Sequence, residues 1–175
     1  ILFVDDFSGR GSFAGTAQDY WAGVFAAVLP ANNQPDRYDV NGPASGVSNG
    51  PGSRANPNHL IDTYSKIVWD CGDLAVFTIS DGTGKSDKSN DCGMLLEWMD
   101  GAEHRTGLWI CGDNIAEELA GLRSGGARTL MRDRCGVDLM HESYNHLTGG
   151  MPGGIVTPLV AGDVEANIFM HSGRP

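Results

Sequence analysis

Two cysteines occur in the same local setting, and both could do chemistry. Cys71 and Cys111 each follow a short apolar run and open a Cys-Gly-Asp triplet, and they are 111 − 71 = 40 residues apart. A cysteine thiol becomes a nucleophile where its surroundings favour the thiolate. That separation leaves room for a strand, a crossover helix and a returning strand, so the two runs predict a parallel sheet. Catalysts and ligands gather at the carboxyl ends of such strands, where we expect both triplets to lie.

The residues around Cys111 predict a strand, an elbow and a helix. The apolar run 107–111 is followed by Gly112 and an Asp-Asn pair that can cap a helix. Glu117 and Glu118 then fall in the expected first turn, where acidic side chains favour the helix dipole. Cys111 is therefore the first candidate for a nucleophile.

Three carboxylates are expected at the same edge of the sheet. Asp5 and Asp6 end the first apolar run, and Asp70 ends the run before Cys71. Carboxylates that meet repel one another unless something neutralises them, so a divalent cation (Ca²⁺ or Mg²⁺) is the cofactor they could hold. A phosphoacceptor receiver domain places acids similarly, but it also needs a lysine after a fifth strand, and the last lysine here is Lys88.

The cysteine spacing argues against a zinc site. The four cysteines lie 19 to 24 residues apart, whereas zinc sites use pairs two to four residues apart. One or two disulfides in an oxidising compartment, or buried free thiols, are the two interpretations that remain. The sequence does not choose a pairing among Cys71, Cys92, Cys111 and Cys135.

Charge and hydropathy exclude two classes of partner. The 175 residues carry a net charge of −10, which repels nucleic acid and anionic lipid. No run approaches the roughly 20 apolar residues that span a bilayer, so we expect no membrane span. The chain starts at Ile1 rather than at a methionine, and we expect it to be a piece of a longer protein.

Apolar periodicity predicts a single α/β domain over residues 1–175. Strands are expected at 1–6, 37–40, 66–70, 107–111, 155–160 and 167–170, and helices at 16–29, 60–65, 92–102, 115–120 and 127–134. This alternation predicts a mostly parallel sheet of five or six strands with helices on both faces. The Gly- and Pro-rich stretch 42–59 and the polar stretch 81–91 are expected to be long surface loops.

Roughly residues 1–137 resemble a known superfamily. The strand ending Val4-Asp5-Asp6, the extended third strand and the elbow Trp109-Ile110-Cys111-Gly112-Asp113-Asn114 are similar to the class I glutamine amidotransferase-like superfamily. They are similar in particular to the degenerate, flavodoxin-like members found inside large secreted bacterial proteins. The resemblance implies a three-layer sandwich. It does not by itself imply catalysis, because one fold hosts many functions.

In active members of that superfamily, a cysteine at the elbow is the nucleophile, with a glycine two residues before it and another two residues after it. Cys111 holds this position, but Trp109 and Asp113 replace the two glycines. A bulky indole crowds the turn. A carboxylate beside the sulfur opposes formation of the thiolate.

The superfamily's base is a histidine on a late strand, followed two residues later by a glutamate. His171 has a similar place, but Gly173 stands where the glutamate should be. His141-Glu142 offers the right residue types at a different spacing. A triad would therefore combine Cys111 with His171 or His141 and an acid such as Glu142.

Two functions follow from these observations. The main hypothesis is a non-catalytic structural or interaction domain of a larger extracellular or periplasmic protein, whose partners are other domains of that protein or neighbouring subunits. The alternative is a cysteine-dependent hydrolase or amidotransferase with Cys111 as its nucleophile. Neither hypothesis requires an organic cofactor.

Overall fold

The chain divides into two compact units, Ile1–Asp138 and Leu139–Pro175. The computed structural model describes residues 1–7, 16–40, 50–72, 74, 76–83, 89–103, 106–112, 114–122 and 124–139. The strands expected at 155–160 and 167–170 lie outside these residues. The single domain expected over 1–175 stays a prediction, and the fold below is that of the first unit.

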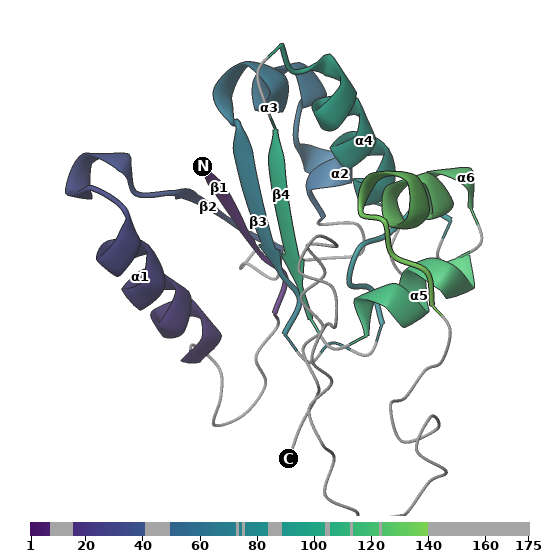
Figure 1. The fold of residues 1–175 in the computed structure, drawn as a ribbon, viewed down its shortest axis with the longest axis horizontal. Coiled ribbons are helices and arrows are strands. Elements are labelled where there is room, and N and C mark those ends of the chain that lie inside the picture. The colour runs from purple at the N-terminus through teal and green to yellow at the C-terminus, as the bar shows by residue number, and fades with distance from the viewer. Residues whose placement is uncertain are drawn as a thin grey trace, which may run out of the picture. The chain divides into compact units, whose positions relative to one another are not determined.

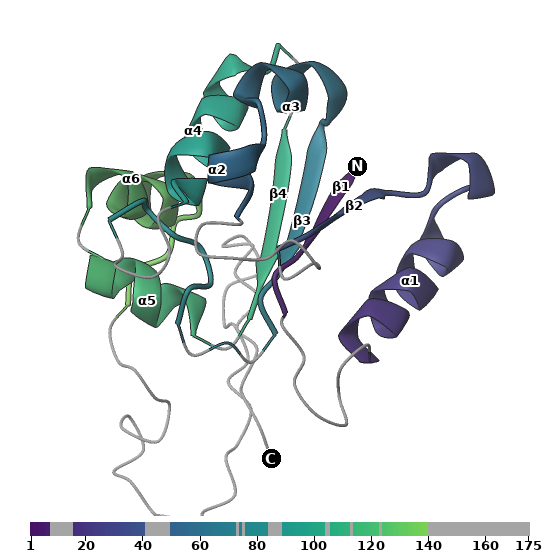
Figure 2. The same cartoon turned by 180° about the vertical axis from the view of Figure 1, so that it is seen from behind.

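Four parallel strands form one sheet in the order β2-β1-β3-β4. Their bounds are β1 (Leu2–Asp5), β2 (Asp36–Asp39), β3 (Lys66–Asp70) and β4 (Gly107–Cys111). The predicted α/β class and parallel pairing are confirmed. The described part of the chain holds four strands instead of the expected five or six. Figures 1 and 2 show the strands side by side from the front and from behind.

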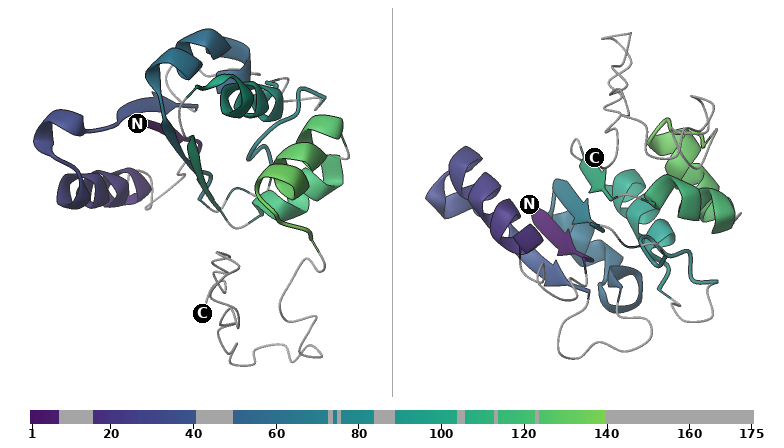
Figure 3. Two further views of the ribbon diagram at one scale, coloured as in Figure 1. Left: turned by 45° about the horizontal axis from the view of Figure 1, so that its top comes forward. Right: turned by 90° about the horizontal axis from the view of Figure 1, so that it is seen from below.

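Helices lie on both sides of this sheet. Figures 1 and 3 show α1 (Thr16–Val28) by itself on one side, with α3 (Pro57–Thr63), α4 (Asp91–Gly101), α5 (Ile115–Leu122) and α6 (Gly125–Arg128) on the other. A π-helical segment, η2 (Thr129–Arg134), continues α6, and a 3-10 turn, η1 (Ala31–Asn33), precedes β2. Because β1 connects to β2 through α1 and β3 to β4 through α4, the two crossovers use opposite faces.

The main core lies between the sheet and the group of helices. Successive side chains of a strand point to opposite faces, so Ile67, Trp69 and Cys71 share the face that these helices cover. Met94, Leu95 and Trp98 of α4 pack against that face, as their helical spacing predicts. On the other face, Phe3 contacts the rings of Trp21 and Phe25 from α1, with centroids 5.7 and 5.4 Å away.

The loop predicted at 42–59 is partly wrong. Residues 42–49 lie outside the described part, but α2 (Pro51–Arg54) and the first three residues of α3 occupy most of the remainder. Each helix begins with a proline, and the Asn56 side chain accepts the N–H of Asn58 to cap α3. The prolines that suggested a loop are therefore helix starts. Of the stretch 81–91, only the ends are described, and Asp81 forms an antiparallel bridge with Asn90.

Trp98 offers a direct test of this core. Its indole N–H donates to the Tyr64 carbonyl at 2.7 Å, and the side chain is fully buried. We expect Trp98→Phe to lower the free energy of unfolding by about 2 kcal/mol, because the carbonyl loses its donor and the smaller ring leaves a void. Urea denaturation followed by circular dichroism measures this loss.

Trp109→Phe is the matched control, since Trp109 is 57% exposed. We expect it to change the free energy of unfolding by less than about 0.5 kcal/mol. Equal losses in the two variants would contradict the assignment of Trp98 to the core.

Candidate functional site

Cys111 lies at the carboxyl end of β4, partly buried and beside Asp70 of β3. Its thiol lies 3.4 Å from the Asp70 Oδ1 atom and 3.4 Å from the Trp69 carbonyl oxygen, and it can donate to either. Burial raises the pKa of the Cys111 thiol to about 12, and the negative charge of Asp70 and its hydrogen bond to the thiol add to the effect. At neutral pH the sulfur is therefore a protonated hydrogen-bond donor and not a thiolate.

The predicted strand, elbow and helix are present, but Cys111 is not part of the strained turn. Its carbonyl accepts the N–H of Cys71 at 2.8 Å, which keeps Cys111 in the regular ladder. The turn falls on Gly112, with a φ of 155°, where a Cβ would approach Cys71 and Ile115 to within 3 Å. Among the described residues other than glycine, only Phe77 has a positive φ. A nucleophile elbow instead places the nucleophile itself on the strained turn.

Asp70 organises the polar groups around Cys111. One carboxylate oxygen accepts the Trp21 indole N–H at 2.9 Å, and the other accepts the Gly72 backbone N–H at 3.1 Å as well as facing the Cys111 thiol. Asp70 is itself buried. These contacts tie α1, β3 and β4 together at the carboxyl edge of the sheet, so Asp70 acts as a structural link.

The three carboxylates proposed as a cation site do not converge. Asp5 and Asp70 are paired neighbours on one face of the sheet. Asp6 reaches the opposite face, where it accepts the Trp69 indole N–H at 3.2 Å and lies 3.8 Å from the Cys71 sulfur. No group of three metal-binding side chains occurs in the part of the chain that the structure describes. A divalent cation at this edge stays a prediction, but these three carboxylates do not share one face, and side-chain alternation along β1 is the signal that could have separated Asp5 from Asp6.

Asp5 has a cationic partner instead. Its Oδ2 atom lies 2.9 Å from a guanidinium nitrogen of Arg37. The same nitrogen lies 2.8 Å from the Oδ2 atom of Asp39. Burial raises the pKa of Asp5 above its usual value, whereas the positive charge of Arg37 lowers it. Arg37 therefore offsets part of the effect of burial on the Asp5 pKa.

None of the four cysteines forms a disulfide. Cys71 and Cys92 are buried, Cys111 is partly buried and Cys135 is exposed, and all four are free. Although Cys71 directly follows β3 and Cys111 ends the neighbouring strand β4, the Cys71 thiol points toward the Thr78 carbonyl oxygen at 3.3 Å and away from the Asp70 side of the sheet. The predicted disulfides are thus not formed in this structure. Burial raises the pKa of the Cys71 thiol, and it raises the pKa of the Cys92 thiol to about 12.

The histidine and glutamate candidates cannot be placed beside Cys111. His141, Glu142 and His171 lie outside the described residues. Their participation in a triad stays a prediction.

Two carboxylates that sequence reasoning did not single out hold the segment after β3. Glu118 of α5 accepts the backbone N–H groups of Phe77 and Thr78 and the Thr78 hydroxyl, the last two at 2.7 and 2.6 Å. Asp91, at the start of α4, accepts the N–H groups of Gly52 and Ser80 at 2.8 and 3.3 Å. Acidic residues in a first helical turn usually signal only the helix dipole, so the sequence gives no sign of these distant partners.

Comparison of the chain with protein-family models, curated proteins and solved structures finds no match. No helix in the described part is long and apolar enough to cross a bilayer.

The Arg37–Asp5 pair predicts a pH-dependent stability. Arg37→Gln raises the pKa of Asp5 further, so we expect a loss of about 1–2 kcal/mol at pH 7, less than for a fully buried pair because Arg37 is 42% exposed. A raised carboxyl pKa means that the folded state binds the proton more tightly. The loss should therefore shrink as the pH falls through the folded-state pKa of Asp5.

Chemical denaturation at several pH values between 4 and 8 measures this dependence. The matched control is the same substitution in an Asp5→Asn background, where the loss should be small and independent of pH. A pH-dependent loss that persists in that background would show that Asp5 is not the group responsible.

Proposed function

We propose that this α/β unit is a non-catalytic structural or interaction domain of a larger extracellular protein. The observation that carries the proposal is the state of Cys111. Its thiol has a pKa of about 12, faces a carboxylate and belongs to a regular strand. A catalytic cysteine needs the opposite surroundings, a nearby positive charge or base that stabilises the thiolate.

We also propose kinship with the class I glutamine amidotransferase-like superfamily, as a degenerate member. The parallel sheet, its order β2-β1-β3-β4 and the β4–α5 elbow support this kinship. The three-layer arrangement with five or six strands belongs to the same proposal, and its extra strands would come from residues outside the described part. What such a member would keep is the scaffold, because the fold does not require the chemistry.

The extracellular or periplasmic location and the partners are part of this proposal. Four free cysteines remove the disulfide argument for an oxidising compartment. The location therefore rests on the resemblance and on a composition of 25 glycines with 19% charged residues. The partners we propose are other domains of the parent protein or neighbouring subunits.

Alkylation separates this proposal from a cysteine-dependent hydrolase or amidotransferase. Iodoacetamide reacts with thiolates, so at pH 7.5 we expect Cys111 to react at least about 100-fold more slowly than free cysteine. Peptide mass spectrometry after timed quenching gives the rate for each cysteine. Exposed Cys135 serves as the internal reference and should be labelled first.

Asp70→Asn extends the test. It removes the charge beside the sulfur, so the thiol pKa of Cys111 should fall and its labelling should accelerate, although burial continues to protect it. Labelling of wild-type Cys111 as fast as free cysteine would instead favour the enzyme.

A further inference from the structure

Beyond Gln18 and Asp19 in its first part, helix α1 carries only apolar side chains and glycine, although the described fold buries only one side of it. Its 13 residues contain a single charged side chain, Asp19. Trp21 and Phe25 face the sheet, where Phe25 is buried. Tyr20 and Val28 on the flank are 70% and 67% exposed. A helix that is apolar all round normally lies inside a protein or an assembly.

The outer side of α1, away from the sheet, consists of small residues. Gly23, Ala26 and Ala27 are all exposed, and a Cβ placed on Gly23 would meet nothing within 4 Å. Small residues allow another surface to approach a helix closely, as they do where helix backbones pack together. The outer side of α1 is therefore suited to contact a flat apolar surface.

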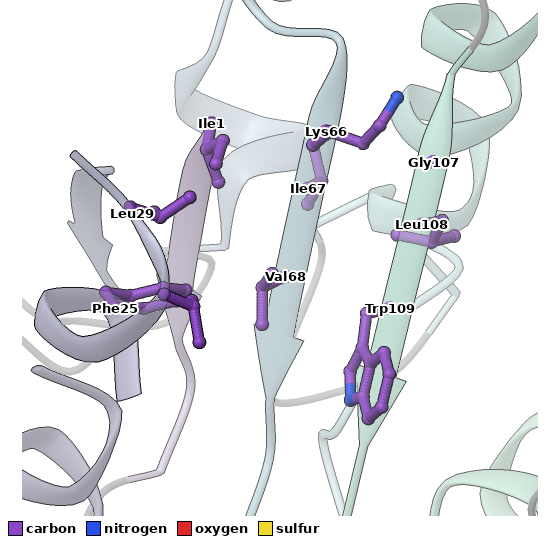
Figure 4. Close-up of a pocket in the computed structure, with 10 residues that line it drawn as sticks. Ile1, Phe25, Leu29, Lys66, Ile67, Val68, Gly107, Leu108 and Trp109 are labelled. Carbon is purple, nitrogen blue, oxygen red and sulfur yellow. The ribbon is translucent and has the colours of Figure 1, made fainter. Parts of the chain in front are cut away.

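Such a surface lies beside α1 on the same molecule. An open groove of about 360 Å³ runs over β3 and β4, and its walls are almost entirely apolar. Figure 4 shows Phe25 of α1 and Leu29, which directly follows the helix, on one side of it and Trp109 of β4 on the other, with Val68 between them. Trp109 is 57% exposed, although parallel sheets normally have both faces covered.

We propose that this face joins two copies of the chain in a two-fold symmetric dimer, in which α1 of each copy lies in the groove of the other. Each α1 would keep its aromatic side on its own sheet and set its small-residue side against the sheet of the second copy. Its exposed Tyr20 and Val28 side chains would pack against the other α1. A two-fold interface uses one surface twice and must complement itself. This surface does so, because it carries an apolar helix next to an apolar groove.

The charges on this face favour the same arrangement. The net charge of −10 opposes association in general, but Asp19 on α1 and Lys66 at the groove are opposite in sign. Trp21 binds Asp70 at the carboxyl end of the sheet, so Asp19 lies toward that end, whereas Lys66 begins β3 at the opposite end. Two helices related by a two-fold axis perpendicular to them run antiparallel. Asp19 of one copy would therefore approach Lys66 of the other.

This inference rests on the interaction role proposed above, since it names a second copy as the partner. The two can fail separately. Alkylation of Cys111 tests whether the domain is catalytic, and the mass in solution tests whether the α1 face joins two copies.

Sedimentation velocity of the whole chain at increasing concentration tests the dimer. We expect twice the chain mass of 18.6 kDa. Val28→Glu should raise the dissociation constant by about 30-fold or more, because it places an unpaired charge inside the interface. Ala27→Glu, also at an exposed position, should act in the same way on the outer side of α1.

A charge exchange tests the predicted orientation. Lys66→Glu alone should weaken the dimer, and Asp19→Lys with Lys66→Glu should restore it. Val137→Glu is the matched control, because Val137 is an exposed apolar residue that lies neither on α1 nor in the groove, and it should leave the mass unchanged. Unchanged circular dichroism and melting temperature would show that each variant remains folded.

Three results would overturn the proposal. The first is an 18.6 kDa monomer at every concentration. The second is a dimer that neither Val28→Glu nor Ala27→Glu weakens. The third is a dimer that Val137→Glu weakens equally.

Discussion

The two faces of a parallel sheet must both be covered, and the rest of this structure depends on that constraint. The strands are apolar on both sides because their crossovers place helices on both sides. One face meets α3, α4, α5 and α6 and forms the main core around Trp69 and Trp98. Among the described elements only α1 lies on the other face, where Trp109 and the groove beside it are exposed. The same imbalance explains why α1 is apolar on sides that its own sheet does not bury.

Buried and partly buried carboxylates are the second organising feature, and they serve structure. Asp70 joins α1, β3 and β4, Glu118 and Asp91 hold the segment between β3 and α4, and Asp5 is matched by Arg37. Each has donors or a cation within reach, as buried charges require. The carboxyl edge of the sheet, where catalysts often gather, is thus occupied by links between elements. Cys111 takes part as a donor to one of them.

Local pattern was enough to predict most elements of the first unit. The strands ending at Asp5, Asp70 and Cys111 and the helices beginning at Thr16 and Asp91 lie within a residue or two of their predicted places, because their apolar periodicity is strong. The helix at 51–54 and the start of the helix at 57–63 were missed because Pro and Gly mark helix starts as well as loops. The site was predicted less well. Its residue types were predicted correctly, but which side chains contact one another was not.

The sequence by itself determined the α/β class, the parallel pairing and the position of Cys111 at the end of a strand, because these depend on spacing along the chain. Only the tertiary structure decided which groups meet. Asp5 and Asp6 are neighbours in sequence but point to opposite faces, whereas Asp70 and Cys111 are distant in sequence but share one face through the β3–β4 register. Burial raises the pKa of the Cys111 thiol, and the carboxylate that this register places against it raises the pKa further, so part of the electrostatics that argue against catalysis arises from long-range pairing.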